Sequence, residues 1–497
     1  MKKGQSIWGV LMFLALVGIG WAQSDSGQQP GDSGQPPSTA PAPAFGPDNP
    51  APQSSDNPPI SGLDQPSLEP QPAARSYFLP GAHVSEAVDS NVGNAANTSS
   101  TSEVTRALGS LTLQRLWRRY DLALDYVGGG AFYSRRNVSA AQLHELGIDQ
   151  RILWRTGQLA LCDSFSYLPE GSFGYDSFGG SGSLSGLGGG ITGGGLGGIG
   201  GNNFFGPGQF ASLGQAPRMT NVAVADIVES LNPRSSVTLA GSYGLVHFTD
   251  RNFGVIDDQP VTAINSRQVA AQAGYSYQLN RKDQIGLVYG YQDFRYPSFI
   301  GTSFDTNLVN VMYGHRISGR MDLVLGGGPQ LTHIRTCVSP LPGIQCVPES
   351  NSRLSASGRA SLRYRFPKTS VGLYYDHYNT SGSGFFVGAE SDVARVNVSR
   401  PIGRVWDATA DIGFTRNRRI ASSLVGGVNA RSYEYLYAGA AVRRQLGRQF
   451  SLFISYQFND LGFDRSVCGT TAPCSRMSQR HVGLIGLDWH PHPIRLD

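Results

Sequence analysis

Polar and apolar residues alternate at nearly every second position along most of this chain, and this period constrains its fold more than any other feature. In "RLSASGRASLRYRF", residues 353–366, arginine and serine occupy one parity, while leucine, alanine, tyrosine and phenylalanine occupy the other. A period of two sends the two sets to opposite faces of a β-strand. The helical period is nearly absent, and "VSAAQLHEL" is its only weak candidate. The sequence therefore predicts an all-β protein.

The first residues have the layout of a secretory signal peptide. Lys2 and Lys3 precede the apolar run "IWGVLMFLALVGIG", and Gly20-Trp21-Ala22 supplies a small-x-small cleavage site. The run is shorter than the about 18 residues that a spanning helix needs, and no other stretch is long and apolar enough. We expect residues 1–22 to be removed on export, and a membrane form to exist only as a closed barrel.

Residues 23–76 are rich in Pro, Gln and Ser, as in "GDSGQPPSTAPAPAFGPDNPAPQ". Such a segment cannot bury enough apolar surface to offset the entropy of ordering it, so we expect a disordered linker. Charged residues make up only 15% of the chain and the net charge is +4, which gives no basis for binding nucleic acid.

Short polar turns alternate with long connections along the rest of the chain, which is the layout of barrel hairpins. The first clear strand ends in a short turn, so another strand must precede it, and 77–88 is the only candidate despite Pro80. We predict a transmembrane antiparallel up-and-down β-barrel of about 18 strands over 77–490, with about 16 as the alternative. A tail follows at 491–497. The other expected strands are 103–117, 119–134, 142–156, 157–168, 218–231, 235–249, 266–279, 283–296, 304–318, 320–335, 353–366, 369–379, 391–400, 404–416, 431–444, 448–460 and 478–490.

Alternation alone does not distinguish a membrane barrel from a soluble all-β exported protein, but aromatic residues favour the barrel. They gather beside the short turns, as in the interfacial girdle of a membrane barrel. The chain also lacks the repeat of about 40–50 residues that propellers show. The predicted girdle is Trp117, Tyr120, Trp154, Tyr364, Phe366, Trp406, Phe450 and Trp489.

The chain resembles Gram-negative outer-membrane β-barrel proteins and is porin-like in size. The stretches "LDYVGGGAFYS", "DQRILWRTGQLAL" and "YGHRISGRMDLVLG" are similar to those of uncharacterised barrel proteins of Acidobacteria. The resemblance implies an outer-membrane location, contact with outer-membrane lipid and insertion by the barrel-assembly machinery. An even strand count places both termini in the periplasm. In such proteins an aromatic residue ends the last strand and the chain, whereas here Trp489 holds that place and a tail follows.

Four of the five cysteines bracket two loops. In an exported protein, Cys337 with Cys346 and Cys468 with Cys474 predict two disulfides, with reduced thiols as the alternative. Cys162 is left over. The G-x-G-x-x-G matches in "GLGGGITGGGLGGIGG" open no helix, so this tract is predicted to be a mobile loop.

No constellation of catalytic or metal-binding residues stands out. His490 and His492 lack further ligands, and no nucleophile elbow accompanies Asp376-His377. We therefore expect no metal, no cofactor and no enzymatic activity.

Arginines on the polar parity are the strongest functional signal. Uncompensated, they would make a lumen that favours anions. The expected function is a passive pore for small hydrophilic solutes, of unknown oligomeric state. One alternative is a non-conducting structural or adhesive barrel, in which arginines pair with acids such as Asp149, Asp407 and Asp411; another is a membrane-embedded hydrolase. The predicted lumen-lining arginines are Arg353, Arg359, Arg363, Arg365 and Arg395.

Overall fold

The structure is a computed structural model. The predicted signal peptide, the linker apart from Ser76, and the glycine-rich tract lie outside the residues that it describes. The described residues are 76–91, 101–134, 140–168, 217–249, 255–256, 259–260, 265–297, 303–338, 347–380, 388–420, 431–463 and 478–496.

Eighteen long strands form the wall of a β-barrel, which confirms the predicted number. They are β1 (Tyr77–Asp89), β2 (Ser102–Leu116), β3 (Tyr120–Tyr133), β4 (Ala141–Leu153), β5 (Gly157–Leu168), β6 (Arg218–Asn232), β7 (Ser235–Phe248), β10 (Ser266–Gln278), β11 (Asp283–Arg295), β12 (Ser303–Ser318), β13 (Met321–Val338), β14 (Val347–Arg365), β15 (Ser370–Thr380), β16 (Ala389–Ile402), β17 (Trp406–Arg419), β18 (Ser432–Gln445), β19 (Phe450–Phe463) and β20 (Ser478–Trp489).

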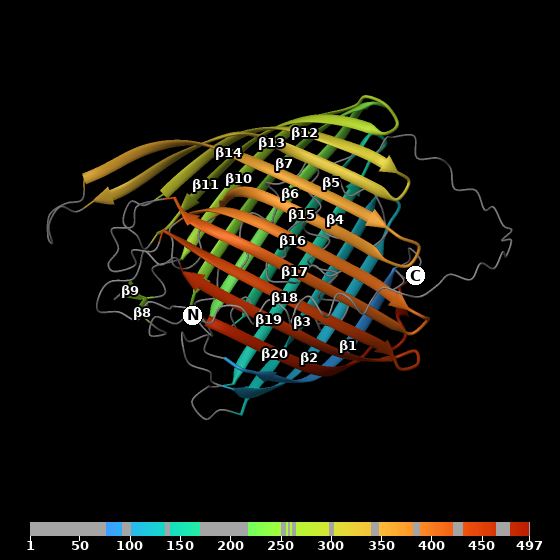
Figure 1. Cartoon of the computed structure of the whole chain (residues 1–497). Helices are drawn as coiled ribbons and strands as arrows, with labels where there is room; N and C mark the ends of the chain where they lie inside the picture. The colour runs from blue at the N-terminus through green and yellow to red at the C-terminus, as the bar shows by residue number, and fades with distance from the viewer. Residues whose placement is uncertain are drawn as a thin grey trace, which may run out of the picture. The chain divides into compact units, whose positions relative to one another are not determined.

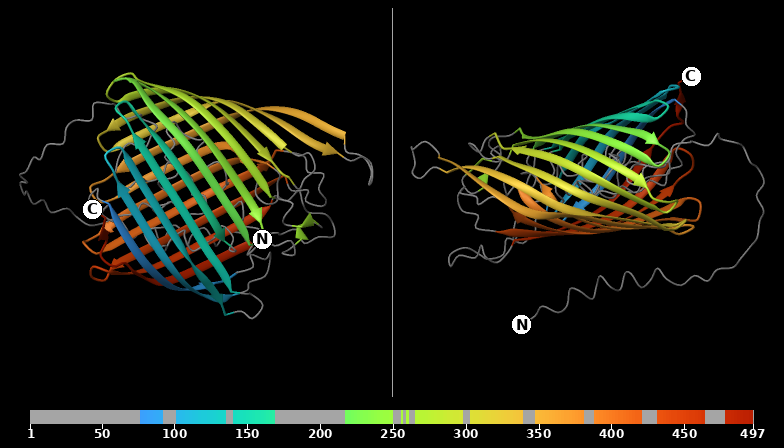
Figure 2. Two further views of the ribbon diagram at one scale, coloured as in Figure 1. Left: turned by 180° about the vertical axis from the view of Figure 1, so that it is seen from behind. Right: turned by 90° about the horizontal axis from the view of Figure 1, so that it is seen from above.

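Each strand is antiparallel to the next, and the last pairs with the first. β1 lies against β20 from Ala82↔Trp489 to Asp89↔Val482, so the sheet closes on itself. Figure 1 shows β12–β20 on the near side of the barrel and the N-terminal strands behind them, and Figure 2 gives the opposite view. Closure leaves no free sheet edge along this seam, which is what a sheet in lipid requires.

The two faces of the wall differ as the alternation requires. On β10, Gln272 is 5% exposed and points inward, whereas its outward neighbour Tyr275 is 45% exposed. On β11, Leu287 is 53% exposed while Val288 is 1% exposed. The outer face is therefore apolar over most strands and the inner face is mainly polar, which is the reverse of a water-soluble barrel.

The elements differ from the sequence-based expectations in a few places. β14 begins at Val347, six residues before the predicted start at 353, and β13 runs on to Val338. The weak helical candidate "VSAAQLHEL" is largely strand β4, and the described residues contain no helix long and apolar enough to cross a membrane. A two-residue pair, β8 (Val255–Ile256) with β9 (Gln259–Pro260), was not predicted.

The predicted C-terminal tail contributes one more short strand. β21 (Ile494–Arg495) pairs with the start of β1, through Phe78↔Ile494 and Tyr77↔Arg495. The backbone N–H of Leu496 also donates to the carbonyl of Ser76 at 3.1 Å. The end of the chain thereby extends the line of contacts begun by β20.

The wall overlaps itself between β14 and β15. Their pairing starts at Arg365↔Ser370, stops at Gly358↔His377, and leaves residues 347–357 of β14 paired with β13 alone. Figure 1 shows β13 and β14 running on beyond their neighbours as a projecting hairpin. The ends of β15–β17 lie inside this hairpin, because their outward residues touch the inner face of β12–β14.

Two contacts define this overlap. The amide of Asn379, which lies on the outward parity of β15, donates to the inward Thr332 hydroxyl at 2.8 Å. The guanidinium of Arg353 on β14 meets the carboxylate of Glu390 on β16 at 2.6 Å. Glu390 is only 4% exposed although its parity is outward, because β14 covers it. Ile420 packs nearby on an inward cluster of Phe294, Tyr296, Phe304 and Ile334.

Candidate functional site: the inward-facing wall

The predicted arginine ladder lies on the inward parity of β14 and β16. Direct pairing places Arg359 opposite Gly326 and Arg363 opposite Asp322, on the face away from the exposed Leu354. Arg363 is half-buried, whereas Arg365 is exposed at the short-turn end of β14. Arg395 on β16 is 3% exposed. The five arginines therefore share one side of the wall but have very different access to solvent.

Acidic partners lie against Arg353, Arg359 and Arg395. Nε of Arg395 donates to Oδ2 of Asp411 at 2.6 Å, and both side chains are buried. Arg359 lies 3.4 Å from Asp376 on the adjacent strand, with both side chains 12% exposed. Arg353 is bound to Glu390 in the overlap. Pairing of this kind neutralises much of the charge that the ladder would present to a solute.

The inward charges as a whole nearly balance. The acids concentrate on β3–β6, and the bases on β14–β18, which lie across the barrel from them (Figures 1 and 2). The inward arginines are Arg106, Arg151, Arg218, Arg316, Arg353, Arg359, Arg363, Arg365, Arg395, Arg419, Arg443 and Arg480, and the inward carboxylates are Asp89, Asp121, Asp125, Glu145, Asp149, Asp226, Asp322, Asp376, Asp407, Asp411 and Asp488.

Between these charged sides the inner wall carries no charge on β7, β10 or β11, three strands that the structure describes in full. Small hydroxyl and amide side chains predominate there. Ser236 and Ser276 share a hydrogen bond of 2.7 Å, and Thr306 on the adjoining β12 lies 3.2 Å from Thr332. This side of the wall offers polar groups but little electrostatic bias.

Glycines on β13 let neighbouring inward side chains lie flat against the wall. Gly328 stands between Asn310 and Ser357, and the Ser357 hydroxyl donates to the Asn310 amide oxygen at 2.5 Å across it. The Met312 sulfur lies where a side chain at Gly326 would project. Side chains of β12 and β14 therefore occupy the space that side chains at these two glycines would take.

The predicted girdle residues lie beside short connections or at the end of β20. Trp117 and Tyr120 are each 47% exposed, Phe366 is 50% exposed, and Tyr364 is half-buried with its ring edge-on to Phe366 at 4.2 Å. Guanidinium groups lie over two of the indoles, Arg115 over Trp117 and Arg444 over Trp406. Exposure of the remaining members ranges from 37% to 40%: Trp154, Trp406, Phe450 and Trp489.

The residues considered for other chemistry do not assemble into a site. Asp376 points inward to Arg359, whereas His377 points outward to Asp392 at 2.6 Å, so the two do not form a dyad. Within the described residues no group of acids, histidines and cysteines could hold a metal ion. Cys162 is a buried free thiol. Neither predicted disulfide can be placed, because the residues that the structure describes do not include Cys346, Cys468, Cys474 or the side chain of Cys337.

Two buried ion-pair groups at the β1–β20 seam were missed by the sequence analysis. Arg480 binds Asp89 at the long-loop end. Near the short-turn end, Asp488 contacts His83 and accepts a 3.3 Å hydrogen bond from Arg443. All five strand positions fit the inward parity, but their pairing depends on how the two ends of the chain align, which local alternation does not encode.

No protein-family model and no curated protein sequence matches this chain. Among solved structures it is similar to the ferric-catecholate import receptor Fiu from E. coli K12, with a TM-score of 0.42 and 10% identity over 85% of this chain and 82% of that one. It is also similar to the outer membrane protein OpdK from Pseudomonas aeruginosa, with a TM-score of 0.39 and 9% identity over 84% of this chain and 98% of that one. A third similar structure is OccAB1 from Acinetobacter baumannii, with a TM-score of 0.38 and 10% identity over 84% of this chain and 96% of that one. At these values the likeness concerns the barrel fold and nothing finer.

Proposed function

We propose that this protein is an outer-membrane β-barrel that acts as a passive pore for small hydrophilic solutes. One observation carries the proposal: a closed wall of eighteen strands has apolar side chains on its outside and mainly polar side chains on its inside. A barrel of this strand number normally encloses an aqueous channel unless something fills it. The predicted signal peptide and the exposed aromatic residues beside the short turns support a membrane location.

We infer further that the short turns and both ends of the barrel face the periplasm, since long loops of such barrels lie outside the cell. Outer-membrane lipid and the barrel-assembly machinery are the partners that this location implies. The proposal includes no catalytic step.

The expected anion preference needs revision in this proposal. Arg353, Arg359 and Arg395 each have an acidic partner, and the inward charges nearly balance. A guanidinium that is paired with a carboxylate attracts a passing anion far less than an unpaired one. The proposed pore is therefore only weakly selective, with any preference for anions arising on the β14–β18 side.

Planar-bilayer conductance of the purified, detergent-folded protein tests the proposal. A water-filled pore gives steady current steps that scale with salt concentration. The buried Arg395–Asp411 pair specifically favours a second candidate, a braced structural barrel, and that candidate predicts silence. Silence from protein whose gel mobility shifts on boiling, the mark of a folded membrane barrel, would reject the pore and retain the barrel.

A further inference from the structure

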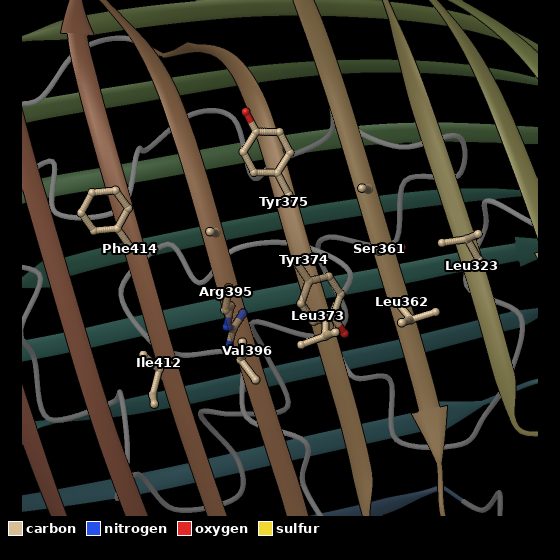
Figure 3. A pocket seen from close by; sticks show the side chains of 12 residues that line it. Leu323, Ser361, Leu362, Leu373, Tyr374, Tyr375, Arg395, Val396, Ile412 and Phe414 are labelled. Atoms are coloured by element: carbon tan, nitrogen blue, oxygen red, sulfur yellow. The ribbon is translucent and has the colours of Figure 1, made fainter. Parts of the chain in front are cut away.

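The outer wall has a groove below the overlap of β14 and β15. It has a volume of about 420 Å3 and spans β13–β17 (Figure 3). Its base is a row of directly paired residues, one from each strand: Leu323, Leu362, Leu373, Val396 and Ile412. The groove lies beside the overlap, because the pairing of β14 with β15 stops at Gly358↔His377, two residues beyond the lining residue Tyr375.

The groove is apolar and open to the surroundings of the barrel. Leu373, Val396 and Ile412 are 39–41% exposed, and Figure 3 shows their side chains on the near side of the sheet while Arg395 lies behind it. Tyr375 stands one row above and is 44% exposed. In water such a surface would be costly, but in a bilayer it fits a hydrocarbon chain.

Charged residues continue the outer face of β17 directly above the groove. The outward series runs from Ile412 through Phe414, which lines the groove, to Arg416 and Arg418. Alternate residues on a strand are about 6–7 Å apart, so the first guanidinium begins where the apolar band ends. The order along the strand, hydrocarbon and then base, matches the order of acyl chain and phosphate in a membrane lipid.

The two acids on the outward parity of β16 have partners other than Arg416. Glu390 is held by Arg353 at 2.6 Å, and Asp392 by Arg418 at 3.2 Å. Arg416 is directly paired with Asp392 on one side and with Glu434 on the other. Its side chain is 51% exposed, and its Nε lies 3.8 Å from the carboxylate of Glu434, which is 56% exposed. A phosphate at the top of the groove could therefore bind the Arg416 guanidinium, because its ion pair with Glu434 is long and exposed to solvent.

We propose that this groove is a binding site for one acyl chain of a phosphorylated membrane lipid, with the phosphate on Arg416. The proposal rests on the membrane location proposed above. One retained lipid would fill the groove beside the overlap.

Native mass spectrometry of the full chain, purified in mild detergent, tests the site. The probes are dilauroyl phosphatidic acid, dilauroylglycerol with the same chains but no phosphate, and inorganic phosphate. Val396→Trp fills the groove and Arg416→Gln removes the charge. The matched controls are Leu287→Trp on the outer face of β11 and Arg267→Gln at the outward rim of β10.

The native protein should retain one phosphatidic acid saturably. Each groove variant should weaken phosphatidic acid binding about tenfold, because it removes either one charge-assisted hydrogen bond or the packing of one acyl chain. The control variants should bind as the native protein does. Arg416→Gln should leave dilauroylglycerol binding unchanged. Equal retention by groove and control variants overturns the site, and full competition by inorganic phosphate overturns the lipid as its ligand. The boiling-dependent gel shift, measured on the same samples, shows separately whether the barrel itself has formed.

Discussion

Arg480 binds both carboxylate oxygens of Asp89 across the seam where β20 meets β1, although 391 residues separate them in the chain. The Nε–oxygen distances are 3.0 and 2.9 Å, and the two side chains are 5% and 2% exposed. A bidentate pair in so dry a place fixes the register of the strands that carry it. The pair joins the first strand of the barrel to the last.

Removing one partner of this pair should destabilise the barrel strongly. Arg480→Gln leaves a buried carboxylate without its guanidinium, and we expect the free energy of unfolding to fall by about 3–5 kcal/mol. Urea unfolding of the folded protein in detergent, followed by the gel shift, measures the change. As a control, Arg316→Gln breaks an exposed 3.4 Å contact with Asp322 and should cost less than about 1 kcal/mol. Equal effects would show that the seam pair does not contribute specifically to closure.

Charge selectivity should respond to the Arg359–Asp376 pair in both directions. Asp376→Asn removes the acid beside Arg359, so the reversal potential in a salt gradient should move toward that of chloride. Arg359→Gln should move it toward that of potassium, and both shifts should grow in dilute salt because screening weakens there. Arg267→Gln, on the outer face, should change nothing. A conducting pore with the same reversal potential in all three variants would place this pair outside the current path.

A side chain at Gly328 should force β12 and β13 apart. A Cβ there would press on the backbone carbonyl oxygen of Val309, which has no freedom to move aside. We expect Gly328→Ala to lower the free energy of unfolding by about 1–3 kcal/mol, the range for overpacking. Gly483→Ala is the matched strand control, because nothing lies within 4 Å of its added methyl group. The prediction is wrong if the two variants have equal urea midpoints.

The two cysteine pairs remain a prediction about the loops. Peptide mapping without reduction should find Cys337 linked to Cys346 and Cys468 linked to Cys474. Loops this short gain about 2–3 kcal/mol at most from a crosslink, so reduction should loosen the loops while barely changing barrel unfolding. Four free thiols in the mapped protein would exclude both bonds.

The strands themselves were predictable because their signal is local. Alternation in 353–366 sets the faces of β14, and the short turns set the strand order. The sequence therefore predicts about eighteen strands, although sixteen stayed open as the alternative. The sequence analysis did not predict the first residues of β14, because "VPESNS" carries polar residues on both parities. It also did not predict β21, because this strand follows the prolines of "HPHP" and proline disfavours a strand.

The partners of the inward arginines were less accessible to sequence reasoning. Asp411 was named as a candidate acid, and it does pair with Arg395, but the choice among many acids depends on register between strands. Glu390 lies on the outward parity, so alternation assigns it to the outer surface. Only the overlap of β14 with β16 explains why it is buried against Arg353.

In an ordinary barrel the strand number and stagger fix the circumference at every height. Here the backbone ladder closes completely at the short-turn end, but residues 347–357 of β14 offer an edge that β15 does not use. The width of the barrel at the long-loop end therefore depends on side-chain contacts, those of Arg353 with Glu390 and of Asn379 with Thr332. At the short-turn end, backbone hydrogen bonds set the width. The diameter of the barrel can therefore vary more at the long-loop end than at the short-turn end, because at the long-loop end it depends on the strength of a few polar contacts.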